Sequence, residues 1–172
     1  MNNPREKLLD VAFNEIYHCG YNATSIDKIL KQASMNKGSM YHFFKSKKEM
    51  GLAVINEKVN FYIEDKYSVL LKYEENICEE LLKLIKNRNN FDFTCGCKLN
   101  NLMQELSPID EDFKVALEKV YLRFENIIEE VLIKAVKKSE IKHNDTKALS
   151  MYVVASIEGC LGTAKKSQDG DI

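Results

Sequence analysis

The stretch Thr24–Lys48, TSIDKILKQASMNKGSMYHFFKSKK, decides the fold. Thr24 with Asp27 three residues later is a conservative variant of the capping box that begins a helix. The apolar residues that follow share one helical face, and residues 33–36 then form a short connector of small and polar residues. Asn36 is a favourable cap for a second short helix over residues 37–44. Two short helices joined by a tight connector predict a helix-turn-helix.

The second of these helices has an unusual composition for its length. Met40, Phe43 and Phe44 can serve the core, which leaves five residues on the outer side: Lys37, Gly38, Ser39, Tyr41 and His42. A cation, a glycine, a hydroxyl, a phenol and an imidazole suit a surface that meets phosphates and base edges. The glycine costs up to about 1 kcal/mol relative to alanine, which is easier to explain if another backbone comes close there. The alternative is a capped helical hairpin that packs within its own domain, with solvated lysines.

The order and spacing of the whole stretch resemble the DNA-binding signature of the TetR family of bacterial transcription repressors. That signature has a Thr-Ser start, an isoleucine soon after, an alanine before the turn, Lys-Gly, an aromatic pair and a closing lysine, and the match extends back to Asn3. The family usually has glycine in the turn where this chain has Ser34, so a positive φ there would be strained. The resemblance implies an all-α fold: an N-terminal three-helix DNA-binding domain with a helix-turn-helix, residues 1–46, followed by a larger helical effector-binding and dimerisation domain, residues 47–172.

Composition and charge agree with this interpretation. The 172 residues include two prolines and seven glycines, and 30% are charged, which is typical of a soluble and mostly helical protein. Residues 1–48 carry 8 Lys+Arg and 4 Asp+Glu, a net charge of +4, whereas residues 49–172 carry 17 and 22, a net charge of −5. A basic segment beside an acidic body is expected if only the first segment touches nucleic acid. Without a secretory signal or an apolar run long enough to span a membrane, we expect a cytoplasmic protein with no membrane contact.

Hydrophobic periodicity predicts helices along the rest of the chain. A first helix starts at Asn3-Pro4 and stops at Gly20. Further helices are expected over residues 47–71, 74–86, 97–106, 107–138 and 146–165, with a loop at 87–93. The last helix is rich in small residues, and in the resembled family the last two helices form a four-helix interface with the second subunit. Close packing inside one subunit is the alternative. The family usually has one more amphipathic helix, where this sequence ends in polar KKSQDGDI.

The resemblance also implies roles for individual residues. Lys37, Ser39, Tyr41 and His42 would face a palindromic double-stranded DNA operator, and Gly38 would allow close approach. Ser25 and Lys47 would hold phosphates, and Thr24 is mainly the cap. A small apolar effector would bind between the long helices and shift the helix that starts at Lys47. Five residues are candidates for lining its cavity, although each is also a plausible core residue: Tyr62, Tyr67, Met103, Phe113 and Phe124.

Cys95 and Cys97 support an alternative in which a thiol senses electrophiles or oxidants. Cys97 near a helix N-terminus would have its thiolate favoured by the helix dipole, whereas a packing role as a small buried residue competes with sensing. The five cysteines are expected to be reduced, because an odd number without a signal peptide does not indicate a disulfide framework. We expect no metal site, no cofactor and no enzyme activity, because the three histidines are scattered and no catalytic motif occurs. A helical adaptor that has lost DNA binding remains a further alternative.

Overall fold

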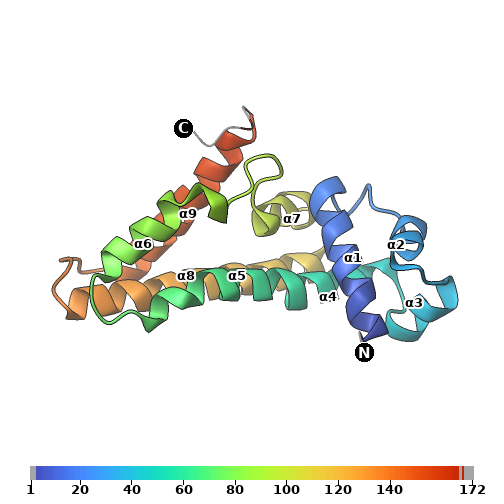
Figure 1. The fold of residues 1–172 in the computed structure, drawn as a ribbon, viewed down its shortest axis with the longest axis horizontal. Helices are drawn as coiled ribbons and strands as arrows, with labels where there is room; N and C mark the ends of the chain where they lie inside the picture. Colours follow the sequence, from blue (N-terminus) through green and yellow to red (C-terminus); the bar gives the residue numbers. More distant parts are fainter. Residues whose placement is uncertain (1–2, 167, 169–172) are drawn as a thin grey trace. The chain divides into compact units, whose positions relative to one another are not determined.

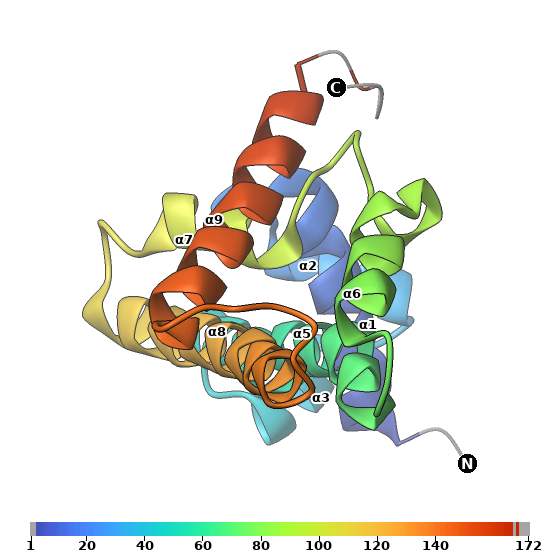
Figure 2. The same ribbon diagram turned by 90° about the vertical axis from the view of Figure 1, so that its left-hand side faces the viewer.

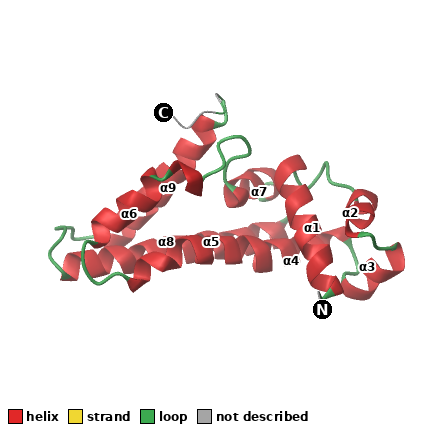
Figure 3. Ribbon diagram, viewed as in Figure 1, coloured by secondary structure: helices red, strands yellow, loops and turns green. Residues whose placement is uncertain are grey.

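The structure is a computed structural model that describes residues 3–166 and 168. Helices are the only regular elements in these residues, with no strand (Figure 3). The chain divides into two compact units, one made of residues 1–61 and 101–120 and the other of residues 62–100 and 121–172. The prediction of an all-α fold is therefore confirmed.

The first unit begins with the three predicted N-terminal helices, which lie close together (Figures 1 and 2). Their boundaries follow local signals: Asn3 caps the first helix, Gly20 ends it at a φ of 84°, and Asn36 caps the third. The bounds are α1 (Pro4–Cys19), α2 (Ile26–Ala33) and α3 (Lys37–Phe43). Apolar residues from each helix fill the core between them, including Leu8, Leu9, Ala12, Ile29, Leu30 and Met40.

The long helix predicted from Lys47 is a continuous helical run that changes type. Ser46 caps it by accepting a hydrogen bond from the Glu49 amide at 3.0 Å. One stretch of π-helix, which is wider than an α-helix, interrupts the run, and a 3₁₀ turn closes it. The run comprises α4 (Lys47–Ala53), η1 (Val54–Val59), α5 (Asn60–Tyr67) and η2 (Ser68–Lys72), and it contributes residues to both units.

The remaining helices agree with the predicted ones to within a few residues. They are α6 (Ile77–Lys86), α7 (Lys98–Leu106), α8 (Glu111–Lys137) and α9 (Thr146–Ala164), whereas the short 3₁₀ turn η3 (Arg88–Asn90) lies in the segment 87–93 that is predicted to be a loop. The helix α6 differs from its prediction in two ways. It starts three residues later than predicted, because Asn76 has a φ of 54°. Helical periodicity places Leu82 on the inner face of the predicted helix, but Leu82 is 50% exposed. Much of the polar ending of the sequence lies outside the described residues.

Candidate nucleic-acid interface

The turn between α2 and α3 is held by a left-handed residue. Ser34 has φ 56° and ψ 46°, and the amide of Met35 reaches back to the carbonyl of Leu30 at 2.9 Å. This is the hydrogen-bond pattern of a helix that ends on a left-handed cap. The positive φ anticipated for the turn is therefore present, on a serine instead of glycine, and it directs the chain immediately into α3.

The cap of α3 fixes how that helix starts. The side-chain oxygen of Asn36 accepts hydrogen bonds from the Ser39 amide at 2.9 Å and the Ser39 hydroxyl at 3.2 Å. A Cβ added at Gly38 would lie 3.2 Å from the same Asn36 oxygen, tighter than an ordinary contact. The glycine thus leaves room for the cap itself, which is a local reason for its presence besides the close approach of another backbone.

One face of α3 is buried and the opposite face is exposed. Met40 is fully buried and Phe44 is 2% exposed, whereas Tyr41 is 54% exposed. Lys37, Gly38 and His42 are also exposed, and Ser39 and Phe43 are half-buried. The Lys37 ammonium lies 3.0 Å from the Asp27 carboxylate, but both side chains are well exposed, so this ion pair is weak and a stronger anion can replace it.

The start of α2 differs from the expectation by one residue. Ser25, not Thr24, is the cap: its hydroxyl accepts a hydrogen bond from the Lys28 amide at 3.2 Å. The Thr24 hydroxyl instead donates to the Gly20 carbonyl at 2.6 Å, and the residue is 1% exposed. A side chain so enclosed is not available to a phosphate, so Thr24 acts inside the loop between α1 and α2.

Three lysines close the quoted stretch, and each has a different environment: Lys45, Lys47 and Lys48. Lys45 is exposed and its ammonium has no partner in the described part of the chain. Lys47 is half-buried over the Tyr21 ring at 4.4 Å, where burial lowers its pKa. Lys48 pairs with Asp110 at 2.8 Å and Asp112 at 2.7 Å, which raises its pKa to about 12. Lys48 therefore serves the fold of this unit, and Lys45 is an exposed cation that the predicted set of DNA-facing residues does not include.

A carboxylate from α7 holds the loop that precedes α2. Glu105 accepts hydrogen bonds from the amides of Tyr21 at 2.9 Å and Asn22 at 2.7 Å. The Tyr21 ring packs edge-on against Phe113 with centroids 4.9 Å apart, and a Cβ added at Gly51 would meet the same ring at 2.6 Å. We call Glu105, Tyr21 and Phe113 the loop anchor. No motif in the sequence indicates it, because Glu105 lies more than 80 residues from its partners.

The five proposed effector-lining residues are divided between the two units. Tyr67 and Phe124 pack together in the core of the second unit with ring centroids 4.2 Å apart. Tyr62 belongs to the same unit and lines a cavity of about 360 Å³ that Lys66 also lines. Met103 and Phe113 belong to the first unit, where Phe113 is part of the loop anchor and Met103 lines a separate surface hollow.

The cysteine environments oppose the expected thiolate. Cys97 is 6% exposed, and burial together with the neighbouring Glu158 raises its pKa to about 12, despite backbone hydrogen bonds at the start of α7. Burial also raises the pKa of Cys95, helped by Asp92. Both groups are therefore protonated thiols near neutral pH, and the expectation that the helix dipole activates Cys97 is wrong.

Other kinds of site are not evident. No group of three or more metal-binding side chains occurs among the residues that the structure describes. In that same part of the chain, no helix combines the length and apolar character needed to cross a membrane.

Comparison with known proteins assigns the two parts of the sequence to one family. Residues 8–54 match the model for bacterial regulatory proteins of the tetR family, and residues 75–172 match the LmrA/YxaF-like transcriptional regulator C-terminal domain. An uncharacterized HTH-type transcriptional regulator in the lacX 3′ region of Lactococcus lactis subsp. lactis is 34% identical over 98% of this chain and 87% of its own length. The transcriptional repressor NemR of Escherichia coli K12 is 27% identical over 67% of this chain and 60% of its own length.

Solved structures show the same fold. The regulatory protein TetR from Rhodobacter sphaeroides superposes with a TM-score of 0.85 at 26% identity, over 96% of this chain and 90% of that one. The reduced form of E. coli NemR gives a TM-score of 0.88 at 23% identity, over 98% of this chain and 90% of that one. The sequence relationship and the helix-turn-helix geometry agree: this chain is a transcriptional regulator of the TetR family.

Proposed function

We propose that this regulator is a repressor that binds a palindromic DNA operator as a homodimer and is released by a small-molecule effector. The observation that carries the proposal is the two-sided α3, with Met40 buried and with Lys37, Tyr41 and His42 exposed. A recognition helix must bury one side in its own domain and offer polar groups to the major groove on the other. Such a protein works where chromosomal DNA is, so we propose a cytoplasmic location.

Within this proposal the residues divide into two groups. Lys37, Ser39, Tyr41 and His42 would contact base edges and nearby phosphates, with Gly38 allowing α3 to come close. Ser25 and Lys47 would contact the phosphate backbone. The Ser25 hydroxyl uses its oxygen as the α2 cap, so its proton remains available to a phosphate. Lys47 would exchange a long 3.4 Å hydrogen bond to the Asn22 carbonyl for a stronger bond to phosphate.

An exposed surface on α9 supports a dimer. Met151 is 48% exposed, and Cβ atoms added at Gly159 and Gly162 would meet nothing within 4 Å. Apolar and small residues on one exposed helix allow the helix of a second copy to approach closely. We propose that α8 and α9 form this interface and hold two recognition helices roughly 34–36 Å apart on the operator.

The division into a DNA-binding domain, residues 1–46, and an effector-binding and dimerisation domain, residues 47–172, is also a proposal. The packing offers a way to couple them. Part of the second segment, including α4 and most of α7, belongs to the same compact unit as the helix-turn-helix. Through the loop anchor, a shift of α7 would reach the loop before α2. An effector that prefers one position of α7 would thereby change DNA affinity.

The test is a gel shift with DNA from upstream of the protein's own gene, in the presence of unrelated competitor DNA. We expect Lys37→Ala and Tyr41→Ala each to weaken binding by about 1–3 kcal/mol if they contact bases. Lys142→Ala, which removes an exposed charge after α8, is the matched control and should bind as the parent does. Parent-like binding by both α3 variants, or no specific binding by the parent, would reject the proposal and favour an adaptor of the same fold.

A further inference from the structure

An apolar groove of about 460 Å³ lies on the second unit. Its walls come from the C-terminal end of α6, from the segment after it and from α9. Ile85, Ile157 and Leu161 supply aliphatic surface, and Phe91 and Phe93 add two rings with centroids 6.4 Å apart. Small-molecule sites typically have volumes of about 300–1,000 Å³ and mostly apolar walls, so the groove has the size and surface of a ligand site.

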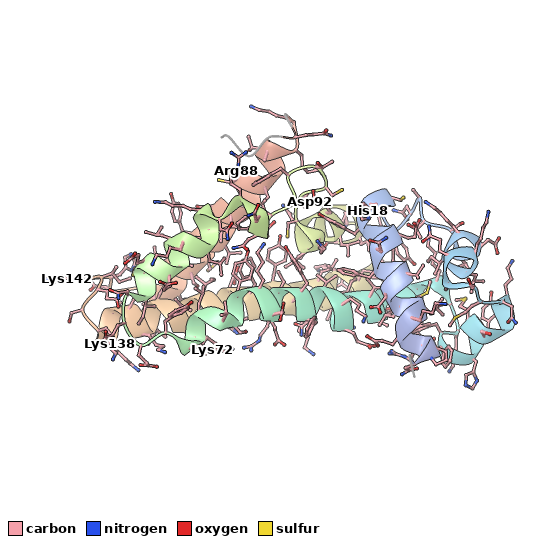
Figure 4. All side chains as sticks on the ribbon, viewed as in Figure 1. His18, Lys72, Arg88, Asp92, Lys138 and Lys142 are labelled. Carbon is pink, nitrogen blue, oxygen red and sulfur yellow. The ribbon has the colours of Figure 1, made fainter. Side chains whose placement is uncertain are left out.

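The charged residues of the groove all have one sign. Lys86 and Arg88 line it close together in sequence, at the end of α6 and just beyond, and no carboxylate is among its lining residues. The ammonium of Lys86 has no hydrogen-bond or ion-pair partner within residues 3–166 and 168. The guanidinium of Arg88, labelled in Figure 4, lies 5.9 Å from the centre of the Phe93 ring. The groove thus combines an apolar surface with a cationic end.

We propose that this groove binds an amphipathic anion, a molecule with a hydrocarbon body and a carboxylate head. The body would lie along the isoleucine, leucine and phenylalanine side chains, and the head would pair with Lys86 and Arg88. Charge-assisted hydrogen bonds to a carboxylate are stronger than hydrogen bonds between neutral groups. The apolar body adds binding free energy in proportion to the area that it buries. The claim that this ligand acts as an effector rests on the proposed repressor function. The claim that the groove binds it rests on the groove alone.

Charge complementarity favours such a ligand over a second copy of the chain. Two copies related by a two-fold axis through the groove would bring two pairs of cations together. No carboxylate is among the lining residues of the groove to offset their repulsion. A small anion can pair with the Lys86 ammonium and cover the apolar surface at the same time.

The test measures binding of dodecanoate to the groove. Dodecan-1-ol, which has the same chain length and no charge, is the control ligand. The chain has no tryptophan, so Tyr152→Trp places a single fluorescent reporter at the groove. We expect saturable fluorescence changes with dodecanoate in the absence of DNA. In the reporter background, Lys86→Glu should weaken dodecanoate binding by about tenfold, the loss expected for one charge-assisted bond. Binding of the alcohol should be weaker than that of dodecanoate and insensitive to this change.

Lys142→Glu in the same background makes an identical charge change away from the groove, at the exposed lysine labelled in Figure 4, and should alter dodecanoate affinity by less than about twofold. Circular dichroism verifies that each variant is folded.

The proposal is overturned if dodecanoate shows no saturable binding, if the two charge reversals have equal effects, or if the alcohol binds as tightly as the acid. Dissociation of a ligand-free dimer by Lys86→Glu, without dodecanoate binding, would instead assign the groove to a second copy. DNA binding is measured independently by gel shift, so that a failure of the DNA-binding proposal can be told apart from a failure of the groove proposal.

Discussion

At the scale of single residues, the strained Ser34 is the clearest departure from what its position favours. Its φ of 56° costs an L-residue about 1–2 kcal/mol, whereas glycine adopts the same conformation freely. Glycine loses more entropy on folding, which offsets part of that gain. We therefore expect Ser34→Gly to raise the free energy of unfolding by up to about 1 kcal/mol, measured by urea denaturation. Ser34→Val, with a branched Cβ, should lower it, and equal midpoints for the two variants would contradict this account.

Glu105 is expected to matter more than its exposure suggests. Truncating it to alanine leaves the amides of Tyr21 and Asn22 without their acceptor, a loss of about 1–3 kcal/mol if water does not replace it. Glu105→Gln keeps one oxygen and should lose less. Hydrogen exchange at the two amides is the direct measurement, because it should accelerate in the alanine variant. Unchanged exchange there would show that the carboxylate does not hold the loop in solution.

At the scale of elements, the ends of some helices can be predicted from the local sequence and the ends of others cannot. Asn3, Asn36 and Ser46 cap the helices that immediately follow them, and each could be predicted because the cap and its amide lie within three residues. The cap of α2 was misplaced by one residue because Thr24 and Ser25 are chemically equivalent caps, and only the enclosed environment of Thr24 separates them. The π-helical turn η1 has no such local signal.

The start of α6 was unpredictable for a different reason. Asn76 provides no side-chain cap, and Glu140, from beyond α8, accepts hydrogen bonds from the amides of Ile77 at 3.0 Å and Cys78 at 2.9 Å. Caps that come from more than 60 residues away depend on tertiary structure, as does the anchor at Glu105. The exposed face of α3 was accessible to sequence reasoning because helical periodicity alone separates Met40 from Tyr41.

This remote cap makes stability depend on pH. The two amide hydrogen bonds hold the pKa of Glu140 below its usual value, so its contribution is present above the unfolded-state pKa and is lost as the pH falls through the folded-state pKa. We expect Glu140→Gln to lower the urea midpoint at pH 7 and to approach the parent as the pH falls below about 4. If the urea midpoints of parent and variant differ by the same amount from pH 7 to pH 3, the lost stability comes from altered packing and not from the lost charge.

At the scale of the whole molecule, the operator complex should depend on salt through a small number of lysines. A dimer presents each lysine twice, so losing one phosphate contact per subunit lowers the steepness of log K against log salt by about 2. Lys45, between α3 and α4, is exposed and its ammonium has no partner among the residues that the structure describes, whereas Lys48 three residues later is held by Asp110 and Asp112. We therefore expect Lys45→Ala to weaken binding to operator and non-operator DNA alike and to make the salt dependence shallower.

Lys48→Ala, which removes the same charge, should lower the thermal midpoint of the free protein and leave the salt slope nearly unchanged. Fluorescence anisotropy from 50 to 300 mM KCl measures both slopes, and a shallower slope for Lys48→Ala with a parental slope for Lys45→Ala would reverse the assignment of these two cations.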